Sequence, residues 1–562
     1  MGKILLISMP SFSRTRLIEQ QTGEFFYTEL FKRSAWPLSI LPIESYIKKS
    51  NPDLSVEIVD LNRTFLKKIN SSEDYKSVLK EVANNYTEFF TEEIVGICKR
   101  EQIDIIGLSA LFDISLSTLL LVAEEVRKAA PNVLIVAGGY PCTNLAADII
   151  AHNPAIDAIC LGEGEIPFAE LVNAVDKWEY IDASPYFVTK KHNGTTKGFI
   201  RDINDIPYLN YDSYIAKYGN EVIREYADII GHSEGHSEGH SEDHSKGAFG
   251  GAEGVVMTSR GCPFRCTFCA AHSIHGHDMR YLSIERVKAE IDYWIDNYNV
   301  ATIAIIDDHF LGDVDRAIEI VDYICGRGIR VFFANMLSLV SVTREFVDCL
   351  VRNRIKDVYF ALESGSVRVL KQIMHKPIAL SRADEVFAMF RGTGIFVKIA
   401  LLVGFPDETP EDINEALRYL RKAEYHWATI SNLIPISGSE IYRRIIGDSG
   451  AEYEIDKSNF FETARYANPE TLEYMLGDIK YTMNLDLNFV HNPHMRMGEH
   501  RLAAGLFEAI LRRYPNHAFA HYYLAKCLDK LGEDGMEHYR EFCNLKDNSE
   551  MWGKYAAHFG LE

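Results

Sequence analysis

Three cysteines lie close together in the segment 260–269, with the spacing C-x3-C-x2-C. They are Cys262, Cys266 and Cys269, and they follow a short apolar run at 254–257 that is typical of a strand. Gly261 and Pro263 supply the turn chemistry of a tight loop. Thiolates this close can converge on one metal centre only from such a loop, so the pattern predicts a metal-binding loop at the end of a strand.

The number of available ligands narrows the kind of metal centre. Structural zinc takes four protein ligands in a closed tetrahedron, and ordinary iron–sulfur clusters also take four cysteines. The next cysteine along the chain is Cys325, far beyond the loop. A set of three thiolates favours a cluster with one iron left open for another ligand. The alternative is a zinc loop that completes its shell with His272, His275 or His277.

The cysteine loop resembles the motif of the radical S-adenosylmethionine (radical SAM) superfamily, including the aromatic Phe268 before the last cysteine. The resemblance implies that each of the three cysteines binds one iron of a [4Fe–4S] cluster, while SAM chelates the fourth iron. It also implies reductive cleavage of SAM, hydrogen abstraction from an unactivated carbon, and an electron donor of the flavodoxin or ferredoxin type.

Composition bounds the class of protein. A chain of 562 residues should hold more than one domain, and 47% hydrophobic with 25% charged residues is typical of soluble globular proteins. A net charge of −21 argues against binding to a nucleic-acid backbone. We find no apolar run long enough to span a bilayer, and the first apolar run is too short for a signal peptide. Ten cysteines without a pairing rhythm indicate a reducing compartment, so we expect a cytoplasmic protein.

The first part of the chain, 1–175, alternates strand-like and helix-like runs. This alternation predicts an α/β fold with a doubly wound, Rossmann-like parallel sheet. Ligands of such sheets bind outside the carboxyl ends of the strands. The expected strands are 3–8, 54–60, 103–108, 133–137 and 157–161, and the expected helices include 38–49 and 116–129.

Small residues stand at three of those carboxyl ends, where they would let a bulky planar ligand approach the backbone. Their order upstream of the cysteine loop resembles the cobalamin-binding domain of cobalamin-dependent radical SAM enzymes. The alternative is that they are ordinary tight turns. We find no Asp-x-His-x-x-Gly motif here, so the domain offers no obvious histidine ligand to cobalt. The expected cobalamin contacts are Ser109, Gly138, Gly139, Gly162, Glu163, Gly164 and Glu165.

The segment 176–250 is expected to be a linker. It contains a Gly-His-Ser-Glu repeat over 231–246. His-rich tracts can bind metal, but regular glycines disfavour a helix, and we interpret the repeat as an insertion in a surface loop without a catalytic role.

The segment 251–455 repeats the strand–helix alternation six times, which matches the partial (β/α)6 barrel of the radical SAM superfamily. Barrel active sites lie at the carboxyl ends of the strands. The resemblance places several strand-end residues near SAM, although each could instead be a solvated strand end or a helix N-cap. These residues are Asp307, Asp308, Glu363, Ser364, Gly404 and Pro406.

The last segment, 456–562, is expected to be a small all-α region. Helices are predicted over 502–515 and 518–531, and their spacing resembles one tetratricopeptide (TPR-like) unit. Because such repeats usually need about three copies for stability, we expect this region to pack on the barrel. The alternative is a contact surface for a protein partner.

The leading functional hypothesis is cobalamin-dependent methylation of an unactivated carbon in a small molecule or peptide. One alternative keeps both cofactors but transfers no methyl group, as in the oxidative or ring-forming anaerobic porphyrin cyclase branch of the family. Another alternative is a non-catalytic cofactor-binding sensor that uses the C-terminal helices as its output surface.

Overall fold

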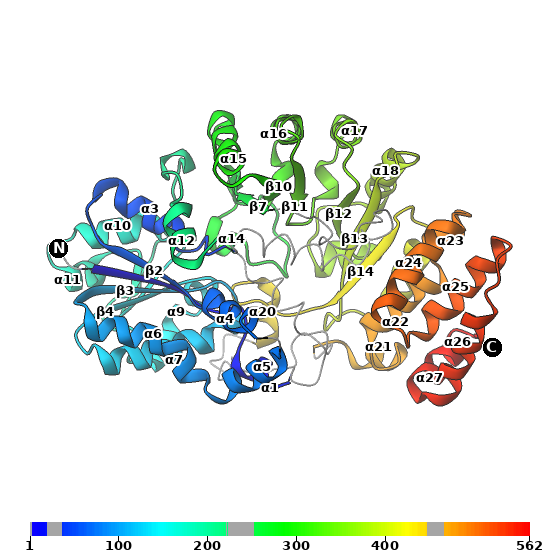
Figure 1. Cartoon of the computed structure of the whole chain (residues 1–562), viewed down its shortest axis with the longest axis horizontal. Helices are drawn as coiled ribbons and strands as arrows, with labels where there is room; N and C mark the ends of the chain where they lie inside the picture. Colours follow the sequence, from blue (N-terminus) through cyan, green and yellow to red (C-terminus); the bar gives the residue numbers. More distant parts are fainter. Residues whose placement is uncertain are drawn as a thin grey trace.

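The computed structural model describes residues 3–19, 36–72, 74–220, 222, 252–446 and 466–561. Along the chain these residues form an α/β domain, a partial barrel and a helical region (Figure 1). The repeat at 231–246 lies outside the described residues. Among the described residues, no helix is long and apolar enough to cross a membrane.

The N-terminal domain is built on a six-stranded sheet in the order β2-β1-β3-β4-β5-β6, which confirms the predicted doubly wound parallel sheet. Five strands are parallel, and β6 pairs antiparallel with β5. The sheet therefore continues past the expected boundary at residue 175, through a strand too short to show a pattern. The strands are β1 (Lys3–Ser8), β2 (Val56–Asp60), β3 (Ile103–Ala110), β4 (Leu134–Gly139), β5 (Ala158–Cys160) and β6 (Phe187–Val188).

Helices cover both faces of this sheet because its strands are apolar on both sides. In β1, Ile4 and Leu6 belong to one core, and Leu5 and Ile7 to the other, as the two-residue period of a strand requires. The principal helices are α3 (Leu41–Ser50) and α10 (Glu165–Asn173) on one face, with α6 (Tyr86–Arg100) and α7 (Leu116–Ala129) on the other. The remaining helices are α1 (Arg14–Glu19), α4 (Leu61–Asn70), α5 (Tyr75–Asn84), α8 (Tyr140–Asn144), α9 (Ala146–His152), α11 (Lys177–Ala183) and α12 (Tyr211–Tyr218).

The barrel has six parallel strands in two three-stranded sheets, which confirms the predicted partial (β/α)6 barrel. Leu337 joins the two sheets, because its N–H donates to the carbonyl of Tyr359 (2.8 Å) and its carbonyl accepts from Ala361 (3.1 Å). The strands are β7 (Ala252–Val256), β10 (Val300–Ile305), β11 (Arg330–Phe333), β12 (Asp357–Glu363), β13 (Phe396–Val403) and β14 (Trp427–Asn432). The helices are α15 (Ile284–Tyr298), α16 (Val314–Gly326), α17 (Arg344–Arg352), α18 (Leu380–Phe390), α19 (Pro410–Leu420) and α20 (Glu440–Ile446).

The C-terminal helices have their own apolar core and dock on the outer edge of β14 (Figure 1). Asn488 covers this edge like an added strand, because its side-chain amide exchanges hydrogen bonds with the backbone N–H (2.9 Å) and carbonyl (2.7 Å) of Ala428. The two predicted helices are present, and a further pair that we did not predict follows them. The helices are α21 (Pro469–Tyr474), α22 (Ile479–Leu485), α23 (Pro493–Arg496), α24 (His500–Arg513), α25 (Ala518–Lys530), α26 (Met536–Asn548) and α27 (Glu550–His558).

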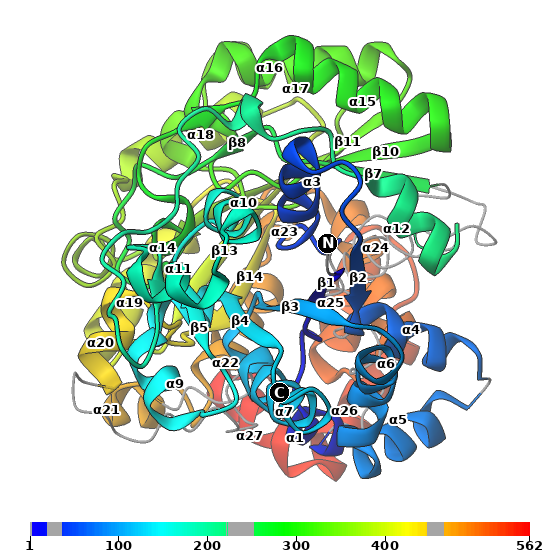
Figure 2. The ribbon, with the colours of Figure 1, turned by 90° about the vertical axis from the view of Figure 1, so that its left-hand side faces the viewer.

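The carboxyl ends of the N-terminal strands point toward the barrel (Figures 1 and 2). Asn144 donates hydrogen bonds to Ser273 Oγ and to the carbonyl of Ser437, both at 3.0 Å. Asp113, just after β3, accepts hydrogen bonds from the backbone and hydroxyl of Ser437. The ligand-binding edges of the two α/β units are therefore in direct contact.

Candidate active site

The cysteine loop leaves the barrel through a two-stranded ribbon. Strand β8 (Ser259–Arg260) pairs antiparallel with β9 (Arg280–Tyr281), so Arg260 and Arg280 lie opposite each other at the base of the loop. Gly261 has a φ of +98°, and a Cβ there would lie 2.3 Å from the carbonyl oxygen of Asp278. Only glycine can therefore begin the loop in this conformation.

The barrel holds the middle of the loop through Thr267, which lies between the second and third cysteines. Its N–H donates to the carbonyl of Met374 (2.9 Å), and its hydroxyl donates to the carbonyl of Ile373 (2.7 Å). Its own carbonyl accepts from the N–H of Ile441 at 2.9 Å. Since every polar group of Thr267 is engaged, the loop is fixed between the segment after β12 and helix α20.

The three cysteines are partly buried free thiols. Burial raises the pKa of each, and that of Cys266 reaches about 11. Lys376 opposes this effect at all three thiols. The Lys376 side chain is 10% exposed, and its ammonium group lies 3.2 Å from the Glu363 carboxylate. Metal binding requires thiolates, and a buried cation beside three cysteines favours that charged form.

The histidines of the zinc alternative have other partners. His275 Nδ1 lies 2.8 Å from Glu163, His277 Nδ1 lies 3.2 Å from the carbonyl of Cys262, and the His272 ring stacks on His277. In the described part of the chain, no three His, Cys, Asp or Glu side chains are grouped to hold one metal ion. His275 and His277 therefore each use one ring nitrogen for a partner other than the cysteine thiols.

The two aspartates after β10 have different surroundings. Asp307 is buried and accepts hydrogen bonds from the N–H and hydroxyl of Thr258 (2.6 and 2.5 Å) and from Ser259 Oγ (2.6 Å). Its carboxylate therefore fixes residues 258–259, which lead into the cysteine loop. Asp308 is half-buried and raises the pKa of Cys262 and Cys269. Asp308 is therefore the aspartate of the pair that acts electrostatically on the cysteines.

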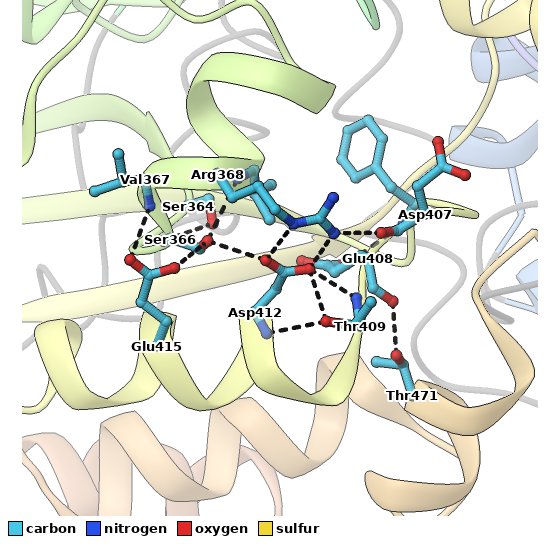
Figure 3. A network of polar contacts seen from close by, with 12 residues as sticks. Ser364, Ser366, Val367, Arg368, Asp407, Glu408, Thr409, Asp412, Glu415 and Thr471 are labelled. Carbon is cyan, nitrogen blue, oxygen red and sulfur yellow. Dashed lines mark hydrogen bonds and ion pairs between the residues drawn. The ribbon is translucent and has the colours of Figure 1, made fainter.

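A polar network joins the loops that follow β12 and β13 (Figure 3). Arg368 donates to Asp412 (2.9 Å), which also forms the capping box of α19 with Thr409. Ser366 donates its hydroxyl to Glu415 (2.7 Å) and its N–H to Ser364 Oγ (3.1 Å). The network thus holds the strand end that carries Ser364 against the helix that follows β13.

Glu363 and Gly404 both have left-handed backbone conformations, with φ of +74° and +86°. The N–H of Gly404 donates to Glu408 Oε2 at 2.7 Å. Glu408 is fully buried, and desolvation raises its pKa to about 7. We did not assign Glu408 from the sequence, although it stands four residues after Gly404. The hydrogen bond from Gly404 to Glu408 closes a turn over residues 404–408, which contains Pro406. Phe405 of the same turn contacts Phe268 of the cysteine loop edge-on, with the ring centroids 6.4 Å apart.

Most glycines at the carboxyl edge of the N-terminal sheet are required by the protein's own packing. A Cβ on Gly139 (φ +96°) would lie 2.0 Å from Ala110 O, and one on Gly162 (φ +77°) would lie 2.9 Å from Gly198 O. At Gly164 a Cβ would lie 2.7 Å from Ile43. For these three the tight-turn interpretation is sufficient. Gly138 differs, because a Cβ there would meet its nearest neighbours in Cys160 only at 3.8 Å.

Two exposed apolar side chains lie on this edge and were not predicted. Leu111 is 41% exposed and Phe112 is 39% exposed, immediately after β3. The buried Ser109 precedes them, and its carbonyl accepts from Met9 at 3.0 Å. The sequence could have indicated this exposed pair, because two large apolar residues directly follow a predicted buried strand. Leu111 and Phe112 follow β3, and Gly138 lies at the end of the neighbouring strand β4.

Glu163 and Glu165 form ion pairs with the barrel. Glu163 contacts Arg260 (3.3 Å), Arg280 (2.6 Å) and His275 (2.8 Å), while Glu165 accepts from Arg260 at 2.8 Å. The same neighbours hold the pKa of Glu163 below its usual range despite burial. The glutamates that we expected at cobalamin therefore bind the base of the cysteine loop.

Tyr140, which follows Gly139 in the N-terminal domain, interacts electrostatically with the cysteine loop. Burial raises its pKa well above the usual value, and Asp308, Cys269 and Cys262 raise it further. The carboxyl edge of the N-terminal sheet and the cysteine loop therefore border one common site.

Comparison with known families identifies both halves of this site. Residues 256–420 match the radical SAM superfamily. The segment 256–420 is therefore a radical SAM domain. Residues 76–172 match the B12 binding domain. The radical SAM superfamily implies a [4Fe–4S] cluster and SAM, and the B12 domain implies cobalamin.

Three curated relatives align with about two thirds of this chain. An uncharacterized methyltransferase of Pyrococcus horikoshii is 26% identical over 64% of this chain and 72% of its own length. Cytidylyl-2-hydroxyethylphosphonate methyltransferase of Streptomyces wedmorensis is 23% identical over 63% of this chain and 69% of its own. Anaerobic magnesium-protoporphyrin IX monomethyl ester cyclase of Cereibacter sphaeroides is 22% identical over 66% and 58%.

Solved structures share the fold. The radical SAM methyltransferase TsrM of Kitasatospora setae, with cobalamin and a [4Fe–4S] cluster, has a TM-score of 0.54 at 14% identity and covers 79% of this chain and 78% of its own. The cobalamin-dependent SAM radical enzyme OxsB has a TM-score of 0.53 at 17% identity and covers 89% and 60%. These similarities support the arrangement of two α/β units and a helical region.

Proposed function

We propose that this protein is a cobalamin-dependent radical SAM enzyme that methylates an unactivated carbon of a small molecule or peptide. The observation that carries the proposal is the direct contact between the two domains, in which Glu163 of the B12-binding domain pairs with Arg260 and Arg280 at the base of the cysteine loop. Relatives named as methyltransferases support the same reaction class. The substrate would bind between the two domains.

The residues of this chain have separate tasks in that reaction. A bound cluster with SAM supplies radical chemistry, and bound cobalamin supplies a methyl group. Cys262, Cys266 and Cys269 would hold the irons from a loop that Thr267 fixes. Lys376, oriented by Glu363, offsets the negative charge of the thiolates. Leu111, Phe112 and Gly138 would bear the corrin ring and exclude water from its face.

Two further aspects of the proposal concern the surroundings of the enzyme. All ten cysteines are free, which supports work in a reducing compartment, and we place the protein in the cytoplasm. A flavodoxin or ferredoxin would supply the electron. The C-terminal helices bury one side on β14, and a protein contact on their other side is a secondary proposal.

The test is anaerobic purification with hydroxocobalamin, SAM and a reductant, followed by spectra and analysis of SAM products. We expect iron–sulfur and cobalamin absorption in one preparation, and formation of both 5′-deoxyadenosine and S-adenosylhomocysteine. A protein that holds both cofactors but consumes no SAM would contradict the enzyme and support a sensor.

A cyclase-like radical reaction without methyl transfer is the second candidate. Two relatives are anaerobic magnesium-protoporphyrin IX monomethyl ester cyclases, from Cereibacter sphaeroides and Rubrivivax gelatinosus. Formation of 5′-deoxyadenosine without S-adenosylhomocysteine, and a product without an added methylene unit, would favour this candidate over the methyltransferase.

A further inference from the structure

One carboxylate of the N-terminal domain holds both ends of the cysteine loop. Arg260 precedes the loop and Arg280 follows it, and both reach Glu163. Arg280 makes two contacts, from Nη1 to Oε2 at 2.9 Å and from Nη2 to Oε1 at 2.6 Å. Inside the loop, His275 Nδ1 lies 2.8 Å from the same carboxylate. Three basic side chains of the loop therefore converge on one acidic side chain from another domain.

The backbone around Glu163 is fixed by the N-terminal domain. Its N–H donates to the carbonyl of Gly198 (2.7 Å), and its Oε2 accepts from the N–H of Ile200 (2.9 Å). Arg280 also donates to the carbonyls of Ile200 (2.5 Å) and His275 (2.8 Å). The carboxylate is thus held in place, because each of its oxygens contacts at least two nitrogen atoms.

This carboxylate is shielded from water. The exposed fractions of the side chains are 1% for Glu163, 7% for Arg260 and 11% for Arg280. A buried charge that loses its partner is strongly destabilised. Removal of the Glu163 charge would leave Arg280 without its carboxylate and Arg260 with Glu165 alone, so the two ends of the loop would move apart.

Apart from the Glu163 contacts and the Arg260–Glu165 ion pair at 2.8 Å, few interactions close the base of the loop. The ribbon of β8 and β9 contains only two residues in each strand, and isolated two-stranded pairs are marginally stable. Within the loop, the N–H of Cys262 reaches the carbonyl of Gly276 at 3.4 Å, the long end of the hydrogen-bond range. The spacing of Cys262 relative to the other two cysteines thus depends on the ion pairs at the base.

We propose that Glu163 is a positioning residue for the iron–sulfur cluster, so that the B12-binding domain forms part of the cluster site. This proposal rests on the proposed function, because it requires the three cysteines to bind a cluster. It assigns Glu163 no contact with substrate. The carboxylate acts through Arg260, Arg280 and His275 to keep Cys262 within reach of the cluster, whether or not cobalamin is bound.

The test compares the full-length protein with two variants that each neutralise one buried carboxylate. Glu163→Gln removes the carboxylate. Asp486→Asn is the matched control, because Asp486 of the C-terminal region is 4% exposed and pairs with Arg421, at the end of α19, and with His491, both far from the loop in sequence. Each protein is reconstituted anaerobically without cobalamin, and iron release to a chelator is followed at a temperature below its unfolding transition.

We expect Glu163→Gln to release iron about tenfold faster than the wild type, since loss of a residue that orients metal ligands typically weakens metal binding 10–100-fold. Asp486→Asn should release iron at the wild-type rate, and Glu163→Asp should restore part of the retention. The electron paramagnetic resonance signal of the reduced cluster should change only in the Glu163 variants.

Equal rates of iron release in Glu163→Gln and the wild type would overturn the proposal. Equally fast release from Asp486→Asn would also overturn it, because general destabilisation would then explain the effect. Failure of the proposed function is distinguishable, since the wild-type protein itself would then hold no iron–sulfur cluster after reconstitution.

Discussion

Lys376 is a buried positive charge near the cysteines, so we expect it to affect the reduction potential of the cluster. Its ammonium group is buried, pairs with Glu363, and acts electrostatically on all three thiols. A positive charge there stabilises the reduced cluster, and nearby charge is one of the factors that set cluster potentials. Lys376→Gln should therefore lower the midpoint potential by on the order of tens of millivolts.

Spectroelectrochemical titration of the reconstituted cluster measures this shift. Lys371→Gln is the matched control, because Lys371 is exposed on the same segment. An unchanged potential in Lys376→Gln, or an equal shift in the control, would show that Lys376 does not tune the cluster.

Glu408 gives the site a pH-dependent stability. Its folded-state pKa is about 7 because burial disfavours the charged form, whereas the usual value for Glu is 4.5. A raised pKa means that this contribution to stability is complete below the unfolded-state pKa and is lost as pH rises through the folded-state value. Glu408→Gln cannot ionise, so its stability relative to the wild type should increase by roughly 2 kcal/mol from about pH 5 to about pH 8.

Denaturant unfolding of both proteins at several pH values measures that difference. The comparison cancels the titration of all other groups. A difference that stays constant across this pH range would show that Glu408 titrates near its ordinary value and that the Gly404 turn does not hold a protonated acid.

At the scale of elements, adjacent glycines at the end of β4 have separable roles. A Cβ at Gly139 would clash with the Ala110 carbonyl, whereas one at Gly138 meets only ordinary contact. Gly139→Ala should destabilise the N-terminal domain by about 1–3 kcal/mol. Gly138→Ala should leave stability nearly unchanged but weaken cobalamin binding about tenfold, because it adds a methyl group where the corrin would lie.

Denaturant unfolding without cobalamin and a spectroscopic cobalamin titration measure the two effects. Wild-type cobalamin affinity in Gly138→Ala would remove this glycine from the cofactor surface. Loss of stability in that variant as large as in Gly139→Ala would contradict the assignment of separate roles.

The sequence predicted the elements well and their long-range contacts poorly. Buried strands such as β3 and β10 carry continuous apolar runs, and helix α7 was predicted at its observed bounds, because both depend on local patterns. The strand β6 was missed because two residues carry no period. The interdomain ion pairs of Glu163 were missed for two other reasons. The glycines on either side of Glu163 indicated a ligand-binding turn, and its partners Arg260 and Arg280 lie about a hundred residues later in the sequence.

The same distinction applies to the site. The three cysteines were found because their spacing is local, and Asp308, Glu363 and Gly404 were placed at strand ends by the alternation. The sequence could not assign different roles to Asp307 and Asp308. Only the fold shows that Thr258 and Ser259 donate hydrogen bonds to the Asp307 carboxylate. It also did not show Lys376 at the cysteines, since the residues between Glu363 and Lys376 carry no such signal.

At the scale of the whole molecule, the two α/β units should be thermodynamically coupled. Glu163 leaves the carboxyl edge where cobalamin would bind and holds the cysteine loop. A ligand that stabilises this edge should also stabilise the loop, and linkage requires the reverse. Hydroxocobalamin should therefore slow iron release from the wild-type protein by about 5-fold or more, and this effect should disappear in Glu163→Gln. Release that is independent of cobalamin in the wild type would contradict the coupling.

The most direct test of a shared radical SAM and cobalamin site is the yield of the two SAM products in matched proteins. The wild type, Cys266→Ala and Gly138→Ala are reconstituted anaerobically with iron, sulfide, hydroxocobalamin and reductant, and then given SAM. The wild type should form 5′-deoxyadenosine and S-adenosylhomocysteine. Cys266→Ala should form no 5′-deoxyadenosine, and Gly138→Ala should lose mainly S-adenosylhomocysteine. Full 5′-deoxyadenosine formation by Cys266→Ala, or neither product from the wild type, would contradict the account.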